Sequence, residues 1–157
     1  KKRMIKLQHP ELLYEKSRIY KIDFSHNSGN LKCFMSKHAK MVIVFTKVGS
    51  GLTQSELQML NNLVIACGFN QDEKLLINLA EKSIDMSVIQ NDFSPKLVLL
   101  FGKIDSDTTL AQLTVNKPSK IGEMIVVKTN HLHEVFNNDS EKGELWKGLK
   151  ASLKLIQ

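Results

Sequence analysis

Four short apolar runs constrain the fold of this chain more than any other feature. They are "MVIVF" at 41–45, "KLLINL" at 74–79, "KLVLLF" at 96–101 and "EMIVV" at 123–127. None of them alternates apolar with polar residues, as a strand with one solvent-exposed face does. Near-continuous apolar runs of this length are typical of parallel strands that helices cover on both faces. We therefore expect four buried strands in a parallel sheet.

Helical patterns separate these runs. "TQSE" at 53–56 is a capping box, in which the side chains of Thr53 and Glu56 satisfy free N–H groups at the start of a helix. The apolar residues that follow it share one helical face: Leu57, Leu60, Val64 and Cys67. A second helix is expected over 83–91, and a short helix or irregular crossover over 107–115.

The chain closes with a helical pattern that Asn138 or Asp139 can cap. Its apolar stripe consists of Leu145, Leu149, Leu153 and Ile156, and Trp146 lies beside it. Repeated strand–helix–strand units predict a three-layer α/β/α domain over 41–157. A basic N-terminal segment, 1–40, precedes it, with a short helix after Pro10, a possible edge strand at 18–24 and a loop at 25–40.

The charge of the chain is unevenly distributed. The net charge is +6, yet residues 1–47 alone carry +8 and the remainder −2. Such asymmetry points either to an acidic partner such as nucleic acid, or to a basic docking arm. The alternative is a solvated basic end, because no aromatic residues interleave with the lysines as in a platform for stacked bases.

The composition also excludes several classes of protein. No apolar run approaches the roughly 20 residues that a membrane helix needs. The N-terminus lacks the apolar stretch of a signal peptide. The two cysteines, Cys33 and Cys67, are too few for a disulfide framework. We expect a cytoplasmic protein without a membrane partner.

Ligands of open parallel sheets bind beyond the carboxyl ends of the strands. The loops that follow the four apolar runs are therefore the candidate ligand-binding segments. In "TKVGSG" at 46–51, the phosphate-binding candidates are Thr46, Lys47, Gly49, Ser50 and Gly51, because glycines let backbone N–H groups approach an anion. Neither the dinucleotide fingerprint nor the P-loop motif is present, so a surface loop before a capped helix is the alternative.

Three further loops lie at this edge, after Leu79, after Phe101 and after Val127. Gly102 follows the third run and indicates a tight turn or a close backbone approach. Asp105 and Asp107 beyond it are ordinary turn residues or a carboxylate pair.

The fourth run ends in "TNHLHEVF", where His131 and His133 are candidate ligand-binding residues. They can share a metal if the segment is extended, but not if a helix has begun. The pattern favours a helix capped by Thr129 or Asn130, so we predict no metal and no cofactor. His131 remains a candidate general acid or base. No nucleophile elbow or activated cysteine motif is present.

Several of these segments together resemble a known family. The pieces "MVIVFTK", "GLTQSELQMLNNLVIACGF", "PKLVLLFGK" and "EVFNNDSEKGELWKGLK" are similar to the psi subunit of the bacterial DNA polymerase III clamp loader. More closely, they resemble psi-like proteins of the Bacteroidetes type. The resemblance covers roughly 41–153.

The resemblance implies a uracil-DNA glycosylase-like fold, with a four-stranded parallel sheet in the order 2-1-3-4. Active glycosylases of that superfamily carry a polar or acidic residue in the loop after the first strand and a histidine motif after the last. Here "TKVGSG" has no Asp, Glu or Asn, and "HLH" matches the second motif only loosely. The departure argues against base excision.

The resemblance therefore implies a non-catalytic adaptor in DNA replication. Its expected partners are clamp-loader subunits, namely a chi-like subunit and the ATPase subunit, with the basic N-terminus as a docking arm. Two alternatives stay open: a nucleic-acid-binding or glycosylase-like enzyme acting on DNA bases, and an α/β domain that binds a nucleotide or another small ligand.

Overall fold

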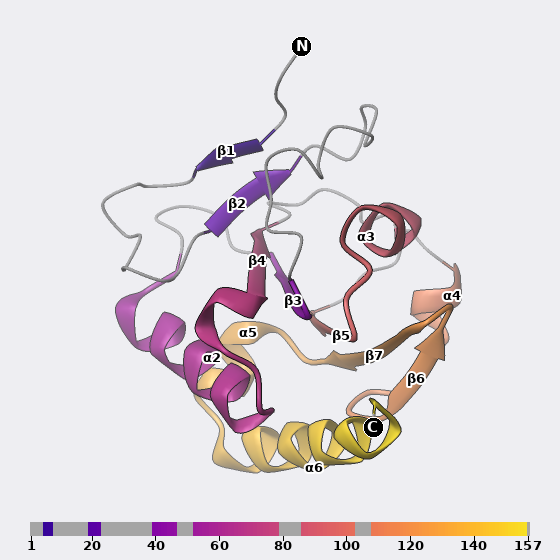
Figure 1. Ribbon diagram of the computed structural model, residues 1–157. Coiled ribbons are helices and arrows are strands. Elements are labelled where there is room, and N and C mark those ends of the chain that lie inside the picture. Colours follow the sequence, from indigo (N-terminus) through magenta and orange to yellow (C-terminus); the bar gives the residue numbers. More distant parts are fainter. Residues whose placement is uncertain are drawn as a thin grey trace.

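The computed structural model describes residues 5–7, 19–22, 39–46, 52–78, 86–102 and 108–156. The elements in chain order are β1 (Ile5–Leu7), β2 (Ile19–Ile22), β3 (Met41–Phe45), α2 (Gln54–Ala66), the short helix η3 (Gln71–Glu73), β4 (Lys74–Asn78), α3 (Met86–Phe93), β5 (Leu97–Phe101), α4 (Thr108–Ala111), β6 (Pro118–Ile121), β7 (Met124–Thr129), α5 (Leu132–Phe136) and α6 (Asp139–Ile156). Helices lie on both faces of the sheet (Figure 1).

The described strands form a seven-stranded sheet in the order β1-β2-β4-β3-β5-β7-β6. Five of them, β2, β4, β3, β5 and β7, run parallel, and β1 and β6 pair antiparallel at the two edges. The four strands expected from the apolar runs lie next to one another in the expected order, 2-1-3-4. The expected number of four strands is too small.

The additional strands lie toward the two edges of the sheet, where the sequence has no continuous apolar run. The strand β6 is the sequence "PSKI", and none of its residues is fully buried, so it carries no apolar run. It forms an edge, where a proline is tolerated and one row of hydrogen-bonding groups stays open. At the opposite side, β2 lies within the strand expected at 18–24, but β1 rather than β2 is the edge strand.

Each strand of the sheet centre contributes to two hydrophobic cores. In β3, Val42 and Val44 pack in the core under α3 and α4, whereas Met41, Ile43 and Phe45 pack in the core under α2, α5 and α6. Every residue of β3, β4 and β5 is buried. This burial on both faces explains why the apolar runs are uninterrupted.

The connecting helices refine the sequence predictions. In α3, the buried residues Met86, Ile89 and Phe93 recur at helical spacing, and the helix ends two residues later than expected from the 83–91 pattern. The expected start at 83 lies outside the described residues. The expected segment at 107–115 contains only the short helix α4, after which the chain turns at Asn116 with a positive φ of 60° and enters β6.

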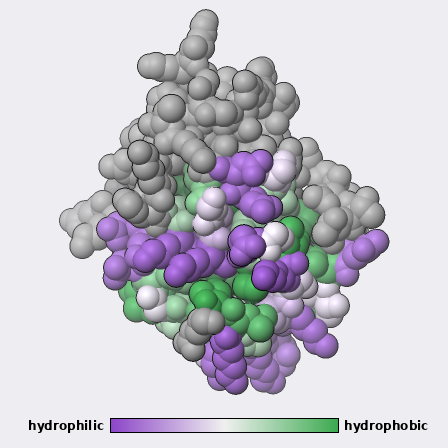
Figure 2. All heavy atoms as spheres, turned by 45° about the vertical axis from the view of Figure 1, so that its right-hand side comes forward, coloured by the Kyte–Doolittle hydropathy of each residue, from purple (hydrophilic) through white to green (hydrophobic). Residues whose placement is uncertain are grey.

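The surface of the described residues is mixed. On the face shown in Figure 2, hydrophilic side chains surround smaller areas of hydrophobic ones. The exposed large hydrophobic residues are Ile65, Val115 and Leu155. None of the helices within the described ranges is long and apolar enough to cross a membrane.

Candidate functional site

The carboxyl edge of the sheet brings together two of the predicted site residues, Gly102 and His131. Gly102 follows β5 with a φ of +94°, and its N–H donates to the carbonyl of Thr129 at 3.1 Å. A Cβ atom added to Gly102 would lie 2.6 Å from Nδ1 of His131. The histidine ring therefore packs against the backbone of a buried glycine, which accounts for glycine at this position.

His131 also marks the start of α5, and this corrects the predicted cap. His131 is the N-cap residue, with a φ of −55° and a ψ of 145°, and its side chain makes no capping hydrogen bond. Thr129 instead ends β7, and the amide of Asn130 donates to the carboxylate of Glu141 in α6 at 2.6 Å. The helix begins one or two residues later than the sequence indicates, because β7 extends through Thr129.

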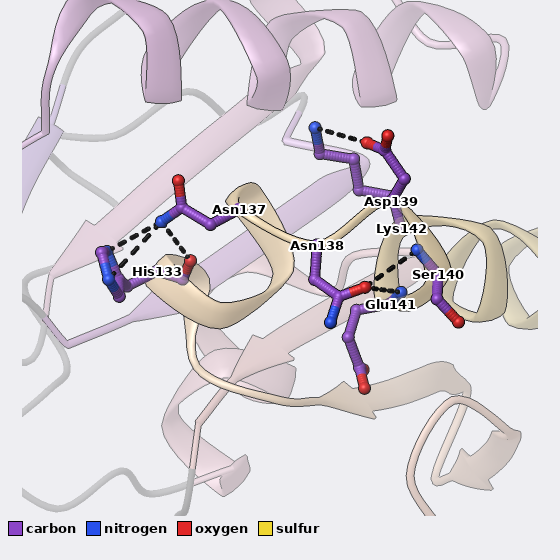
Figure 3. Close-up of polar contacts among 7 residues, drawn as sticks. All are labelled: His133, Asn137, Asn138, Asp139, Ser140, Glu141 and Lys142. Carbon is purple, nitrogen blue, oxygen red and sulfur yellow. Dashed lines mark hydrogen bonds and ion pairs between the residues drawn. The ribbon is translucent and has the colours of Figure 1, made fainter.

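His133 has a different neighbour. The amide nitrogen of Asn137 lies 3.1 Å from Nδ1 of His133 and also donates to the His133 carbonyl at 2.9 Å. Figure 3 shows the His133 ring directed along α5 toward Asn137. Since the ring of His131 packs on Gly102 instead, the two histidines do not face a common point. Across the residues that the structure describes, no group of three or more His, Cys, Asp or Glu could hold a metal.

The predicted phosphate loop is described only at its first residue. Thr46 follows β3 at the same carboxyl edge and is exposed. The candidates Lys47, Gly49, Ser50 and Gly51 lie outside the described residues, as do Asp105 and Asp107.

Two buried polar residues at the carboxyl edge were not predicted as site residues. Asn78 ends β4 and Thr129 ends β7, and each is only 1% exposed. Asn78 has an interaction partner, whereas Oγ1 of Thr129 makes no hydrogen bond. The sequence does carry a signal for both, because each is a polar residue at the end of an apolar run. A buried hydroxyl without a partner costs free energy of folding, about 1–3 kcal/mol.

A lysine is buried at the opposite edge of the sheet. Lys74 begins β4, is 9% exposed, and donates from Nζ to the carbonyl and the side-chain Oε1 of Gln71 at 3.2 and 2.8 Å. Burial lowers the pKa of Lys74 to about 8. Beside it, Glu73 pairs with Lys40 at 2.8 Å, and the hydrogen bond from Lys40 lowers the pKa of Glu73. The hydrogen bonds hold Lys74 in place against the strand end.

The cysteine that the structure describes, Cys67, has a buried and unreactive thiol. Cys67 is 6% exposed and packs in the core under α2 and α6. Burial raises the pKa of its thiol to about 11. Since the thiolate is the reactive form, Cys67 is a core residue rather than a nucleophile.

An apolar groove lies between α2 and α6, with one lining residue from α5. It has a volume of about 490 Å³ and is open to solvent. Its apolar lining consists of Met59, Leu63, Ala66, Val135, Leu145 and Trp146. Its polar lining consists of Ser55, Gln58, Asn62 and Lys142. Most of the lining comes from one face of α2 and from two successive turns of α6.

The groove could be predicted only partly from the sequence. The predicted core stripe of α2 runs through Leu57, Leu60 and Val64, all of which are buried. Met59 and Leu63 lie beside this stripe and are only partly buried against the core. The apolar face of α2 is thus wider than its contact with the sheet requires, and this excess width is the signal that sequence reasoning missed.

Charges are few around the groove. In α2 the one ionisable residue is Glu56, which is buried and accepts a hydrogen bond from the N–H of Thr53 at 2.9 Å. On α6, Nζ of Lys142 lies 5.4 Å from the ring centroid of Phe136 and 3.6 Å from the Asp139 carboxylate. One turn after Trp146, Nζ of Lys150 lies 5.9 Å from the Trp146 ring centroid. The Lys150 ammonium therefore lies near the largest apolar side chain of the groove, and Lys142 is the charged residue of the lining itself.

No protein-family model matches this chain, and no curated protein matches it either.

Proposed function

We propose that this protein is a non-catalytic adaptor that binds another protein through the groove between α2 and α6, and that it serves as a psi-like accessory subunit of a clamp loader in DNA replication. The observation that carries the adaptor proposal is the groove itself. Partly exposed Trp and Met side chains in one concave site are typical of the anchor points of protein interfaces. The clamp-loader role rests on the sequence resemblance.

The carboxyl edge gives less support to catalysis. Among its described residues, His131 packs on Gly102, His133 contacts Asn137, and Thr129 is buried beneath the surface. General acid–base chemistry needs a titratable side chain directed at the reacting group of a substrate. Among the described residues of this edge, both histidine rings instead lie against neighbouring protein groups, so binding is the function that the geometry supports best.

The test is an affinity capture with the intact chain from a nuclease-treated lysate of the source cell, read by mass spectrometry. Ala66 is exposed and lines the groove, whereas its neighbour Ile65 is 58% exposed and does not. Ala66→Glu and Ile65→Glu therefore introduce the same charge at adjacent positions of one helix. Thermal melts of both variants verify that the fold is retained.

The proposal expects clamp-loader subunits to bind the wild type and Ile65→Glu, and to be lost with Ala66→Glu. If neither wild type nor control captures a clamp-loader subunit, the replication role is wrong. If Ala66→Glu captures them as well as Ile65→Glu does, the groove is not the docking site.

A docking role for the basic N-terminus is tested by substitution rather than deletion. The strands β1 and β2 pair in the same sheet as the rest of the chain, so removing them would uncover the edge of β4. Replacing Lys1, Lys2 and Arg3 by Ala leaves both strands in place. Loss of the ATPase subunit from the captured set is the expected result.

A further inference from the structure

The walls of the groove are two helices, and this shape suits a third helix. α2 and α6 present side chains from successive turns, which form ridges with a concave strip between them. Met59 and Leu63 on one wall and Trp146 on the other provide apolar contacts at helical spacing. Amphipathic helices bind such grooves through apolar residues spaced three, four or seven apart.

The charged residue of the groove lining is Lys142, on the α6 wall, and Lys150 lies one turn beyond Trp146 on the same helix. Lys142, Trp146 and Lys150 are spaced four residues apart and so follow one stripe along α6. The acidic residues nearby on α6 are engaged, because Glu141 accepts from Asn130 at 2.6 Å and Glu144 pairs with Lys147 at 3.1 Å. Asp139 is fully exposed at 3.6 Å from Lys142, and such an exposed pair contributes little.

We infer that the groove binds an amphipathic helix of a partner protein that carries Asp or Glu side chains next to its apolar face, placed to meet Lys142 and Lys150 while the apolar residues contact Trp146, Met59 and Leu63. This inference rests on the proposed function, since it names the chemistry of the partner at the proposed docking site.

Nucleic acid is a poorer fit to the same groove. Its phosphates require a row of basic groups, and the α2 wall, "QSELQMLNNLVIA", contains neither Lys nor Arg. An apolar wall with neutral Ser, Gln and Asn at its rim suits the apolar face of a helix, with charge at one side only.

The experiment is a selection from a displayed library of random peptides of about 15 residues, a length at which helices become marginally stable in water. The intact chain is the target, and the Ala66→Glu chain removes peptides that bind elsewhere. We expect the selected peptides to combine apolar residues at helical spacing with more Asp and Glu than the starting library. Absence of any groove-dependent peptide, or enrichment of Lys and Arg, overturns the inference.

A matched pair of charge reversals then tests the two lysines. The best selected peptide is titrated by fluorescence anisotropy against Lys142→Glu/Lys150→Glu and against Lys147→Glu/Lys154→Glu, which makes the same change in net charge on other positions of α6. We expect the first variant to bind about tenfold more weakly or worse, and the second to stay close to wild type. Equal weakening in both variants overturns the assignment to Lys142 and Lys150.

The result separates this inference from the proposed function. Clamp-loader capture that depends on Ala66 but not on Lys142 and Lys150 leaves the adaptor function standing and overturns the acidic helix. Groove-dependent acidic peptides without any clamp-loader capture support the inference on partner chemistry and overturn the replication role.

Discussion

The ring of His131 packs directly on the backbone of Gly102, so that a Cβ at residue 102 would lie 2.6 Å from Nδ1 of the histidine. The contact joins the ends of β5 and β7, which are neighbours in the sheet. It is also reinforced by the hydrogen bond from the N–H of Gly102 to the carbonyl of Thr129. The pair therefore fixes the geometry of the carboxyl edge at this point.

Gly102→Ala should lower the free energy of unfolding by about 2–4 kcal/mol, because it adds both left-handed backbone strain and a clash with the imidazole. In a His131→Ala background the clash is absent and the cost of Gly102→Ala should fall to about 1–2 kcal/mol. Urea denaturation of the four proteins of this double-mutant cycle measures the coupling. Additive effects would mean that the ring does not rest on Gly102 in solution.

Two glycines of α6 should respond in opposite ways to the same substitution. A Cβ on Gly143 meets nothing within 4 Å, whereas a Cβ on Gly148 meets the backbone carbonyl of Asn116. Asn116 cannot easily retreat, because its N–H donates to the carbonyl of Lys128 at 2.7 Å.

Gly143→Ala should therefore stabilise the protein by about 0.5–1 kcal/mol through helix propensity. Gly148→Ala should destabilise it by about 1–3 kcal/mol through overpacking. Chemical denaturation followed by circular dichroism reads both variants. A stabilising Gly148→Ala would show that α6 does not pack against the turn at Asn116 as described.

Sequence patterns located the centre of the sheet because burial on both faces leaves a continuous apolar run, as in β3 and β5. The same reasoning did not predict β6, because Pro118 begins it, Lys120 is exposed and its other residues are only half-buried. The crossover at 107–115 was expected to be a short helix or irregular, and the structure has the four-residue helix α4 there.

The two candidate sites differ in how much of each could be predicted from the sequence. Gly102 and His131 lie close together because they follow two neighbouring parallel strands, β5 and β7. Both residues were predicted as candidates from the sequence. The groove depends on how α2 and α6 lie relative to each other on the sheet, which no local pattern encodes. The cap of α5 was mispredicted because Thr129 satisfies its backbone in β7, and strand pairing outweighs a local capping preference.

The stability of the protein should rise with pH where Lys74 loses its proton. Burial holds the pKa of Lys74 near 8, below its ordinary value of 10.5. Between these two values the folded state has released the proton while the unfolded state still binds it, so raising the pH favours folding. Below the lower value both states are protonated, and the cost of burying the charge is fully present.

Lys74→Met removes this dependence and serves as the reference. The free energy of unfolding of wild type relative to Lys74→Met should rise by about 1–3 kcal/mol from about pH 7 to about pH 10.5. The opposite contribution of Cys67, whose pKa is raised, is common to both proteins and cancels in the difference. A difference that stays constant across this range would mean that Lys74 keeps an ordinary pKa in the folded protein.

Replacing Thr129 by Val should stabilise the protein. Thr129 is 1% exposed and its Oγ1 has no hydrogen-bond partner, so folding removes the hydroxyl from water without compensation. Val has nearly the same shape and keeps the β-branched side chain that suits β7, while it lacks the buried hydroxyl. The expected gain is about 0.5–1.5 kcal/mol in the free energy of unfolding, measured by urea denaturation.

Thr129→Ser is the matched control, because it keeps the hydroxyl and removes the methyl group. It should destabilise the protein by about 1 kcal/mol through the small cavity that it leaves. If Thr129→Val were instead the destabilising variant and Thr129→Ser neutral, the hydroxyl would have to be hydrogen-bonded in the folded protein. The ends of β5 and β7 would then contain a polar contact in addition to the packing of His131 on Gly102.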